Sequence, residues 1–159
     1  MGYYVEMTDA KARIDGSKLD EAYQRLIELD KHDEWKRGGL YGPSGQTARW
    51  YSWLDQDYAT KYTTAVEILE ALDFSYIEYT DGGISLTGYD NKHGQEDLFL
   101  WAISDLFDEG SFIIWRGEDG EIWAHQFGGG KKMTVHNVEP CISDNGDEFV
   151  PATWSVWSV

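Results

Sequence analysis

Two Asp-Gly pairs constrain the fold of this chain more than any other feature. Each pair stands between two runs rich in aromatic and β-branched residues, which are typical of strands. Asp-Gly in that setting favours the tight turn of a β-hairpin, because both of its residues adopt positive φ readily. The sequence therefore predicts two hairpins, with strands at residues 74–79 and 84–88, and at residues 111–117 and 121–127.

Apolar residues recur at helical spacing in three further segments. These run from Leu19 to about His32, from about Thr60 to Asp73, and from about Gln95 to Phe107. Ser17 and Asp20 resemble a capping box at the start of the first segment, with Ser17 as the N-cap. Helices that alternate with strand pairs predict an α+β fold, an antiparallel sheet with helices packed on one face. The repeated helix-then-hairpin order allows a ferredoxin-like or a duplicated arrangement.

The length of 159 residues predicts a single domain that spans residues 1–159. Further strands are expected at Tyr3–Thr8 and Lys131–Asn137, and a loop is expected after Glu139. Thr153–Val159 alternates like a terminal edge strand. That strand either completes the sheet or pairs with a second copy, which leaves a homodimer open.

Negative charge is concentrated in the middle of the chain. Residues 50–121 hold 16 acidic residues against 3 basic ones, and the whole chain has a net charge of −16. Such a field repels nucleic acid and anionic membranes and attracts basic partners. The chain opens without a basic region followed by an apolar run, and no apolar stretch has the length of a membrane span. We therefore expect a cytoplasmic protein with no direct nucleic-acid or membrane contact.

The sequence contains no common catalytic or cofactor-binding motif, so we predict no catalytic residue and no cofactor. With Cys141 as its one cysteine, the chain forms neither an intramolecular disulfide nor a cysteine-based zinc site. Residues 55–57 and 144–148 are rich in oxygen ligands but lack the spacing of a calcium-binding EF-hand. No metal site is predicted.

His125 is the histidine with the clearest environment. Strand alternation places it on one face with Trp123 and Phe127, and hairpin pairing is expected to add Phe112, Ile114 and Met133. A histidine among large apolar side chains is interpreted as a structural core residue rather than a general base.

The third predicted helix has an unusual polar side. Asp97, Trp101, Ser104, Asp105 and Asp108 fall opposite its apolar arc. A tryptophan among carboxylates either packs under a neighbouring segment or forms an exposed anchor for a basic partner. Both interpretations remain open.

Acidic residues at neighbouring turns extend this side of the molecule, among them Asp90, Glu118 and Asp119. A row of carboxylates can imitate nucleic-acid phosphates and occupy a groove built from Lys and Arg. The alternative is that the acids only keep an aromatic-rich protein soluble.

A different kind of site is suggested by the glycine-rich residues 38–47. Lys36, Arg37 and Arg49 flank this segment. They predict either an anion or nucleotide pocket or, if glycine only marks turns, a plain connecting loop.

Leu86–Leu100 and Trp115–Trp123 resemble stretches of small uncharacterised proteins from bacteriophages and related actinobacterial mobile elements. The resemblance assigns no chemistry, but it implies a setting in which small acidic phage proteins counter host defence. We therefore expect a non-enzymatic inhibitor in the host cytoplasm that binds a basic host protein, a nuclease or CRISPR-type complex. A small-ligand or nucleotide-binding protein is the alternative.

Overall fold

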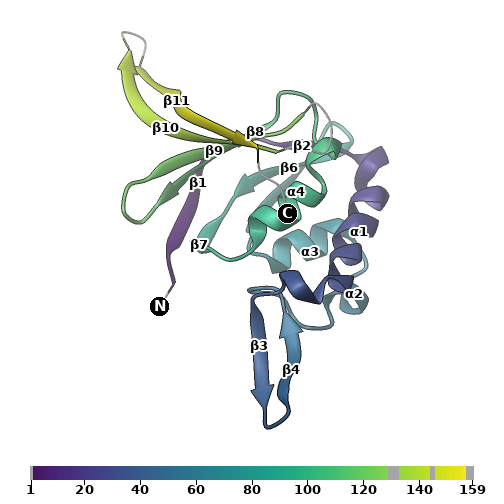
Figure 1. The fold of residues 1–159 in the computed structure, drawn as a ribbon. Coiled ribbons are helices and arrows are strands. Elements are labelled where there is room, and N and C mark those ends of the chain that lie inside the picture. Colours follow the sequence, from purple (N-terminus) through teal and green to yellow (C-terminus); the bar gives the residue numbers. More distant parts are fainter. Residues whose placement is uncertain (1, 129–132, 144–145, 157–159) are drawn as a thin grey trace.

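The computed structural model describes residues 2–128, 133–143 and 146–156, which form an α+β fold. Every strand pairing that it describes is antiparallel, so the predicted fold class is confirmed. Figure 1 shows the α-helices gathered on one side of the strands. No helix in the described part of the chain is long and apolar enough to cross a membrane.

The largest sheet contains strands from both ends of the chain. Its strands are β1 (Tyr4–Lys11), β7 (Asp90–Lys92), β8 (Phe112–Gly117), β9 (Ile122–Gln126), β10 (Thr134–Ser143) and β11 (Gly146–Val156). Their order across the sheet is β11-β10-β9-β8-β1-β7. The N-terminal strand β1 therefore lies in the sheet beside the β8–β9 hairpin, next to the short edge strand β7.

A smaller three-stranded sheet packs beside β1. It consists of β2 (Arg13–Asp15), β6 (Gly83–Gly88) and β5 (Tyr76–Thr80), with β6 in the middle. The link between β1 and β2 joins the two sheets, since the Ala12 carbonyl accepts a hydrogen bond from the Leu86 N–H at 2.9 Å. Because the hairpins β5–β6 and β8–β9 belong to different sheets, they do not form the single sheet of a ferredoxin-like fold.

Both predicted hairpin turns are confirmed. Asp81 and Gly82 have φ values of 48° and 76°, the positive values that a two-residue hairpin turn requires. Gly120, with φ at 87°, closes the turn between β8 and β9.

The helices are shorter than the periodicity predicts. They are α1 (Leu19–Glu28), α2 (Tyr58–Lys61), α3 (Ala65–Ala71) and α4 (Glu96–Ala102), with 3-10 turns after α1 (Leu29–Lys31) and α4 (Ser104–Leu106). The helix predicted over residues 60–73 is two helices, because Tyr62 is extended and Thr64 starts a new one. The Thr64 Oγ1 accepts the Glu67 N–H at 3.2 Å and caps α3.

Ser17 is not the N-cap predicted for the first helix. It lies inside a short 3-10 turn, Gly16–Lys18, that precedes α1. The cap of that turn is Asp15, whose carboxylate accepts the Ser17 N–H at 3.1 Å and the Ser17 hydroxyl at 2.6 Å. The capping residue, Asp15, thus lies two positions before the predicted cap, Ser17.

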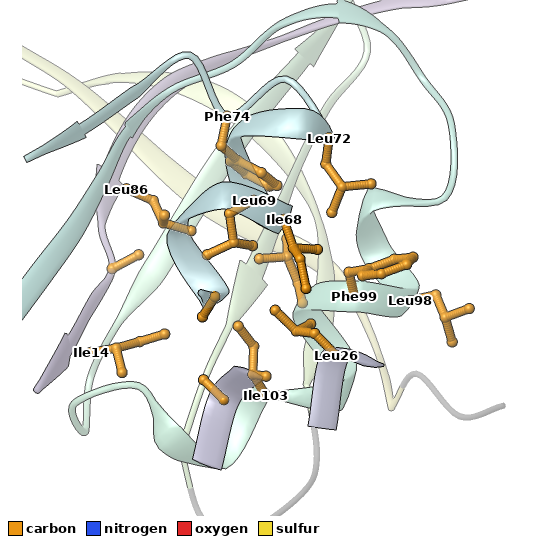
Figure 2. Packing of buried hydrophobic residues seen from close by; sticks show 14 of the residues in the cluster. Ile14, Leu26, Ile68, Leu69, Leu72, Phe74, Leu86, Leu98, Phe99 and Ile103 are labelled. Carbon is orange, nitrogen blue, oxygen red and sulfur yellow. The ribbon is translucent and has the colours of Figure 1, made fainter. Parts of the chain in front are cut away.

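Apolar side chains of α1, α3 and α4 meet in one core (Figure 2). Leu26, Ile68 and Phe99 are fully buried there. Tyr51 and Tyr58 are buried against Phe99, with ring centroids 5.1 and 5.8 Å from it. Their hydroxyls donate to the Leu29 and Leu26 carbonyls at 2.6 and 2.8 Å, which supplies partners for carbonyls near the end of α1.

Two predicted loops are strands in the structure. The glycine-rich residues 38–47 belong to a hairpin of β3 (Gly38–Gly42) and β4 (Gly45–Trp50). The region after Glu139 continues β10 and forms β11. Pro140 and Pro151 favour a loop in sequence. In the structure each of them lies where β10 or β11 has a strand neighbour on one side only, so its missing N–H is tolerated. The predicted terminal edge strand is confirmed as far as Val156, and residues 157–159 lie outside the described residues.

Candidate functional site

The polar side predicted for the third helix is largely neutralised inside the molecule. Asp105 forms an ion pair with Arg25 of α1, and both side chains are mostly buried. Asp108 pairs with Arg13, whose Nη1 lies 2.9 Å from Oδ2. Ser104 is fully buried. The expectation of a solvent-facing polar arc is therefore wrong at Ser104 and Asp105, whereas the Asp108 side chain is 44% exposed.

Trp101 is partly buried and packs against the core. It lines a shallow hollow of about 260 Å³ with Trp35, His32 and Leu29, and the His32 and Trp35 rings stack at 3.8 Å. This geometry corresponds to the interpretation in which the indole packs under a neighbouring segment.

The other predicted acidic residues do come together, at the end of the six-stranded sheet that holds β7 and the β8–β9 turn. We define the acidic rim as Asp90, Glu118, Asp119 and Glu121. Asp90 starts β7 directly opposite Glu6 of β1. Glu118 is held against the same strand, since its N–H donates to the Tyr4 carbonyl at 2.9 Å. All four rim residues are exposed.

A surface hollow of about 380 Å³ lies at the rim. Its walls include Tyr4, Glu6, Asp90, Arg116 and Glu118. Arg116 forms an ion pair with Glu6, so the positive charge in this lining already has a partner.

Asp119 organises the β8–β9 turn, which carries three of the four rim residues. Its Oδ1 accepts the Tyr3 hydroxyl and the Glu121 N–H, the latter at 3.0 Å. The Tyr3 hydrogen bond, followed by that of the Glu121 N–H, lowers the pKa of Asp119. The same hydrogen bond, with burial and the charges of Asp119, Glu121 and Glu118, raises the pKa of Tyr3 to about 12. A Cβ atom at Gly117 would lie 1.7 Å from the Tyr3 hydroxyl, so a larger residue there would displace Tyr3 from Asp119.

Next to the rim, on the helix side of the sheet, is a second cavity of about 280 Å³, which we name the aromatic cleft. Its lining is Tyr3, His93, Glu96, Asp97, Trp115, Glu121, Trp123, His125 and Val135. Trp115 and Trp123 face each other directly across β8 and β9, and Trp115 is 1% exposed. Of the residues that line the cleft, Asp97 was predicted from the sequence as part of a site, whereas Trp115, Trp123 and His93 were not. The Asp119-Gly120 turn carried a signal for the two tryptophans, because it sets the hairpin register that places Trp115 opposite Trp123.

His125 is buried, as predicted, at 5% exposure. Its neighbours differ from the prediction, because the register pairs His125 with Ile113 and places Trp115, rather than Phe112 and Ile114, on its face. A shift of one residue moves every side chain to the opposite face of a strand. Trp115 Nε1 lies 3.2 Å from His125 Nδ1. Since an indole N–H only donates, Nδ1 is the acceptor and the neutral ring carries its proton on Nε2.

Three titratable residues before and within the first turn of α4 form the acidic side of the cleft. Glu96 is buried and accepts hydrogen bonds from His93 Nδ1 and, at 2.8 Å, from the Gly94 N–H. The bond to Glu96 raises the pKa of His93 against the opposing effect of burial. Burial, followed by the charge of Glu96, raises the pKa of Asp97. A carboxylate in this position is short of compensating positive charge.

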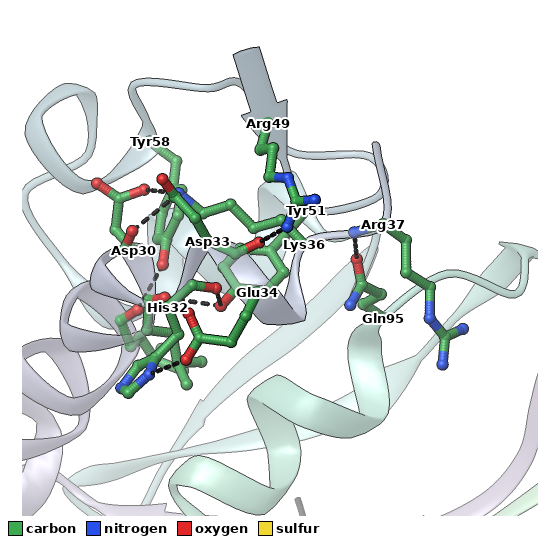
Figure 3. A network of polar contacts seen from close by, with 12 residues as sticks. Asp30, His32, Asp33, Glu34, Lys36, Arg37, Arg49, Tyr51, Tyr58 and Gln95 are labelled. Carbon is green, nitrogen blue, oxygen red and sulfur yellow. Dashed lines mark hydrogen bonds and ion pairs between the residues drawn. The ribbon is translucent and has the colours of Figure 1, made fainter. Parts of the chain in front are cut away.

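Of the basic residues proposed for an anion pocket, the side chains of Lys36 and Arg49 belong to a different network, whereas Arg37 contributes only its backbone N–H (Figure 3). Lys36 is 9% exposed, and its Nζ lies 2.8 Å from Asp30 Oδ1 and 2.7 Å from Asp33 Oδ1. Arg49 Nη1 donates to the Asp33 carbonyl at 2.9 Å, while the Arg37 N–H donates to Gln95 Oε1 at 3.1 Å. Two carboxylates already neutralise Lys36, so this geometry does not favour a nucleotide pocket.

The structure describes part of the two oxygen-rich segments, residues 55–57 and 144–148. Asp55 pairs with Lys61 at 2.5 Å. Residues 144–145 of the second segment lie outside the described residues. In the part of the chain that the structure describes, no group of three or more His, Cys, Asp or Glu side chains could hold a metal ion.

A scan against protein-family models found no match, and neither did searches of curated proteins and of solved structures. The resemblance to bacteriophage proteins therefore stays a prediction.

Proposed function

We propose that this chain is a non-enzymatic binding protein that holds a basic protein surface against its acidic rim. One observation carries the proposal. The fold brings Asp90 from β7 together with Glu118 from the β8–β9 turn, 28 positions further along the chain, in the lining of one hollow. The arginine nearest to them is held by Glu6. The rim thus presents several exposed carboxylates whose charge is not cancelled by the cations lining its hollow.

The proposal moves the expected contact away from the third helix. Asp105 and Asp108 have arginine partners within the chain, and Trp101 packs against the core. Breaking those ion pairs to meet a partner would cost stability, whereas the rim carboxylates are available without rearrangement. Asp90, Glu118 and Glu121 therefore form the contact, and Asp119 holds their turn in place.

A nucleic-acid-handling protein fits the rim best among basic partners. A groove that binds phosphates does so with Lys and Arg side chains that release counterions, and fixed carboxylates satisfy the same side chains. The host-defence setting comes from the bacteriophage resemblance alone.

Capture from a lysate with defined elution tests the proposal. The immobilised chain should retain basic proteins at about 0.05 M salt and release them as the salt rises to about 0.5 M, because exposed ion pairs are screened. Duplex DNA should displace the same proteins if their phosphate-binding groove is occupied by the rim. Retention that is indifferent both to salt and to DNA would contradict the proposal.

A further inference from the structure

The aromatic cleft combines features that the acidic rim lacks. It is slightly more enclosed than the hollow at the rim, and the cross-strand partners Trp115 and Trp123 of β8 and β9 both line it. Trp115 is almost completely buried, and Trp123 is partly buried opposite it on β9. Flat aromatic faces of this kind attract cations through the negative charge of their π electrons.

Carboxylates supply the second feature. Asp97 and Glu121 enter the lining from α4 and from the end of the β8–β9 turn, and Glu96 lies behind His93. Asp97 accepts the Leu98 N–H at 2.9 Å, and its nearest positive charges are His93 and Arg37. Glu96 already holds His93. The cleft thus combines carboxylates from α4 and from the β8–β9 turn with aromatic residues of β8 and β9.

We propose that the aromatic cleft binds a guanidinium group, stacked on the partly buried ring of Trp123 and paired with the carboxylates of Asp97 and Glu121. The planar guanidinium fits this lining better than an ammonium, because it stacks on aromatic rings and donates to carboxylates within the same plane. A cavity of about 280 Å³ holds a head group of this size. It lies below the usual range of sites for larger ligands.

Two sources could supply the group, a free small guanidine or an arginine side chain of another protein. The cleft is separate from the hollow at the rim, with Glu121 as the rim residue that it shares. The inference therefore holds whether or not a basic protein binds the rim.

Calorimetric titration of the intact protein at about 0.15 M salt tests the inference. The probes are methylguanidine for a free ligand and N-acetyl-arginine amide for a protein side chain. The neutral isostere N-acetyl-citrulline amide is the control. Both guanidinium probes should bind saturably and the citrulline compound should not. The tighter of the two identifies the source.

Matched variants assign the site. Asp97→Asn and Glu121→Gln should each weaken binding by about tenfold, since each removes a charge-assisted pair. Asp57→Asn, which removes an exposed carboxylate at the start of α2, should leave it unchanged. Circular dichroism verifies that the variants are folded, and Glu121 is exposed, so its replacement does not disturb the core. Equal binding of the citrulline compound, absence of saturable binding, or indifference to both cleft variants would overturn the inference.

Discussion

The indole N–H of Trp115 donates to Nδ1 of His125 at 3.2 Å, and both side chains are buried in the sheet beneath the aromatic cleft. The bond fixes the tautomer of His125 and orients the tryptophan that lines the cleft. It also explains why this histidine is structural, because the nitrogen that a general base would use is already engaged.

The first prediction concerns this bond. Trp115→Phe should lower the free energy of unfolding by about 1–3 kcal/mol, because it leaves the buried His125 Nδ1 without a donor. Tyr41→Phe, at a position 78% exposed, should change it by no more than about 0.5 kcal/mol. Chemical denaturation measures both. In the wild-type protein, nitrogen NMR should show the His125 proton on Nε2, and a proton on Nδ1 would contradict the assignment.

The second prediction separates internal from surface acids. Asp105→Asn should cost about 1–3 kcal/mol of stability, because Arg25 then keeps a mostly buried charge without its full partner. Glu28→Gln breaks an ion pair with Lys31 in which both side chains are more than half exposed, and should cost less than about 0.5 kcal/mol. Equal effects in urea titrations would mean that Asp105 faces solvent after all.

Acid sensitivity provides the third prediction. Hydrogen bonds from the Ser17 hydroxyl and N–H, with that from Arg13, lower the pKa of Asp15 from 3.8 to about 2. A carboxyl group whose pKa is lowered by folding stabilises the fold at pH values above its unfolded-state pKa. That contribution is lost as the pH falls through the folded-state pKa. The stability difference between wild type and Asp15→Ala should therefore be constant above about pH 4 and shrink toward pH 2. A difference that does not change across this range would refute the cap.

The fourth prediction is the pH dependence of guanidinium binding to the cleft. Burial and Glu96 raise the pKa of Asp97, so this carboxyl takes up a proton at a higher pH than an exposed one. Glu96 also raises the pKa of His93, so that ring stays positive to a higher pH than an unperturbed histidine, and Arg37 adds a second positive charge nearby. Both titrations make the cleft less attractive to a cation in acid. The affinity for guanidinium should rise as the pH increases through the pKa values of Asp97 and His93. Asp97→Asn should remove the part of this rise that comes from the Asp97 carboxyl.

Local sequence signals predicted the elements and the fold class well where they depend on turn chemistry. Asp81-Gly82 identified its hairpin because few dipeptides accept a positive φ at both positions, and Gly120 supplies the positive φ in the turn between β8 and β9. Prolines were a weaker guide. Pro140 and Pro151 indicated a loop, yet a strand with an open side tolerates a missing donor, and sequence alone does not show which strands have one.

The site was harder to predict, because it depends on pairing between distant segments. Helical spacing put Asp105 and Asp108 on the polar side of their segment, but only the packed fold reveals Arg25 and Arg13 beside them. Asp90 and Glu118 were expected at the margin of an acidic surface centred on the third helix. Instead they line one hollow at the end of the six-stranded sheet, because β1 lies between β7 and β8 and is the neighbour of both. Charge composition predicted that an acidic surface exists, and the strand order determines where it lies.

The account depends most on the acidic rim, and a matched charge reversal tests it directly. Asp90→Lys with Glu118→Lys changes the rim while leaving the aromatic cleft intact, and Asp57→Lys with Glu70→Lys makes the same change in net charge at two exposed positions on α3 and next to α2. The dissociation constant for a basic protein retained by the wild-type chain is measured for both variants at the same salt concentration. We predict that the rim variant weakens binding by at least about tenfold and that the control variant changes it by less than about threefold. Equal losses in the two variants would show that net charge alone attracts the partner, and would contradict the proposed contact.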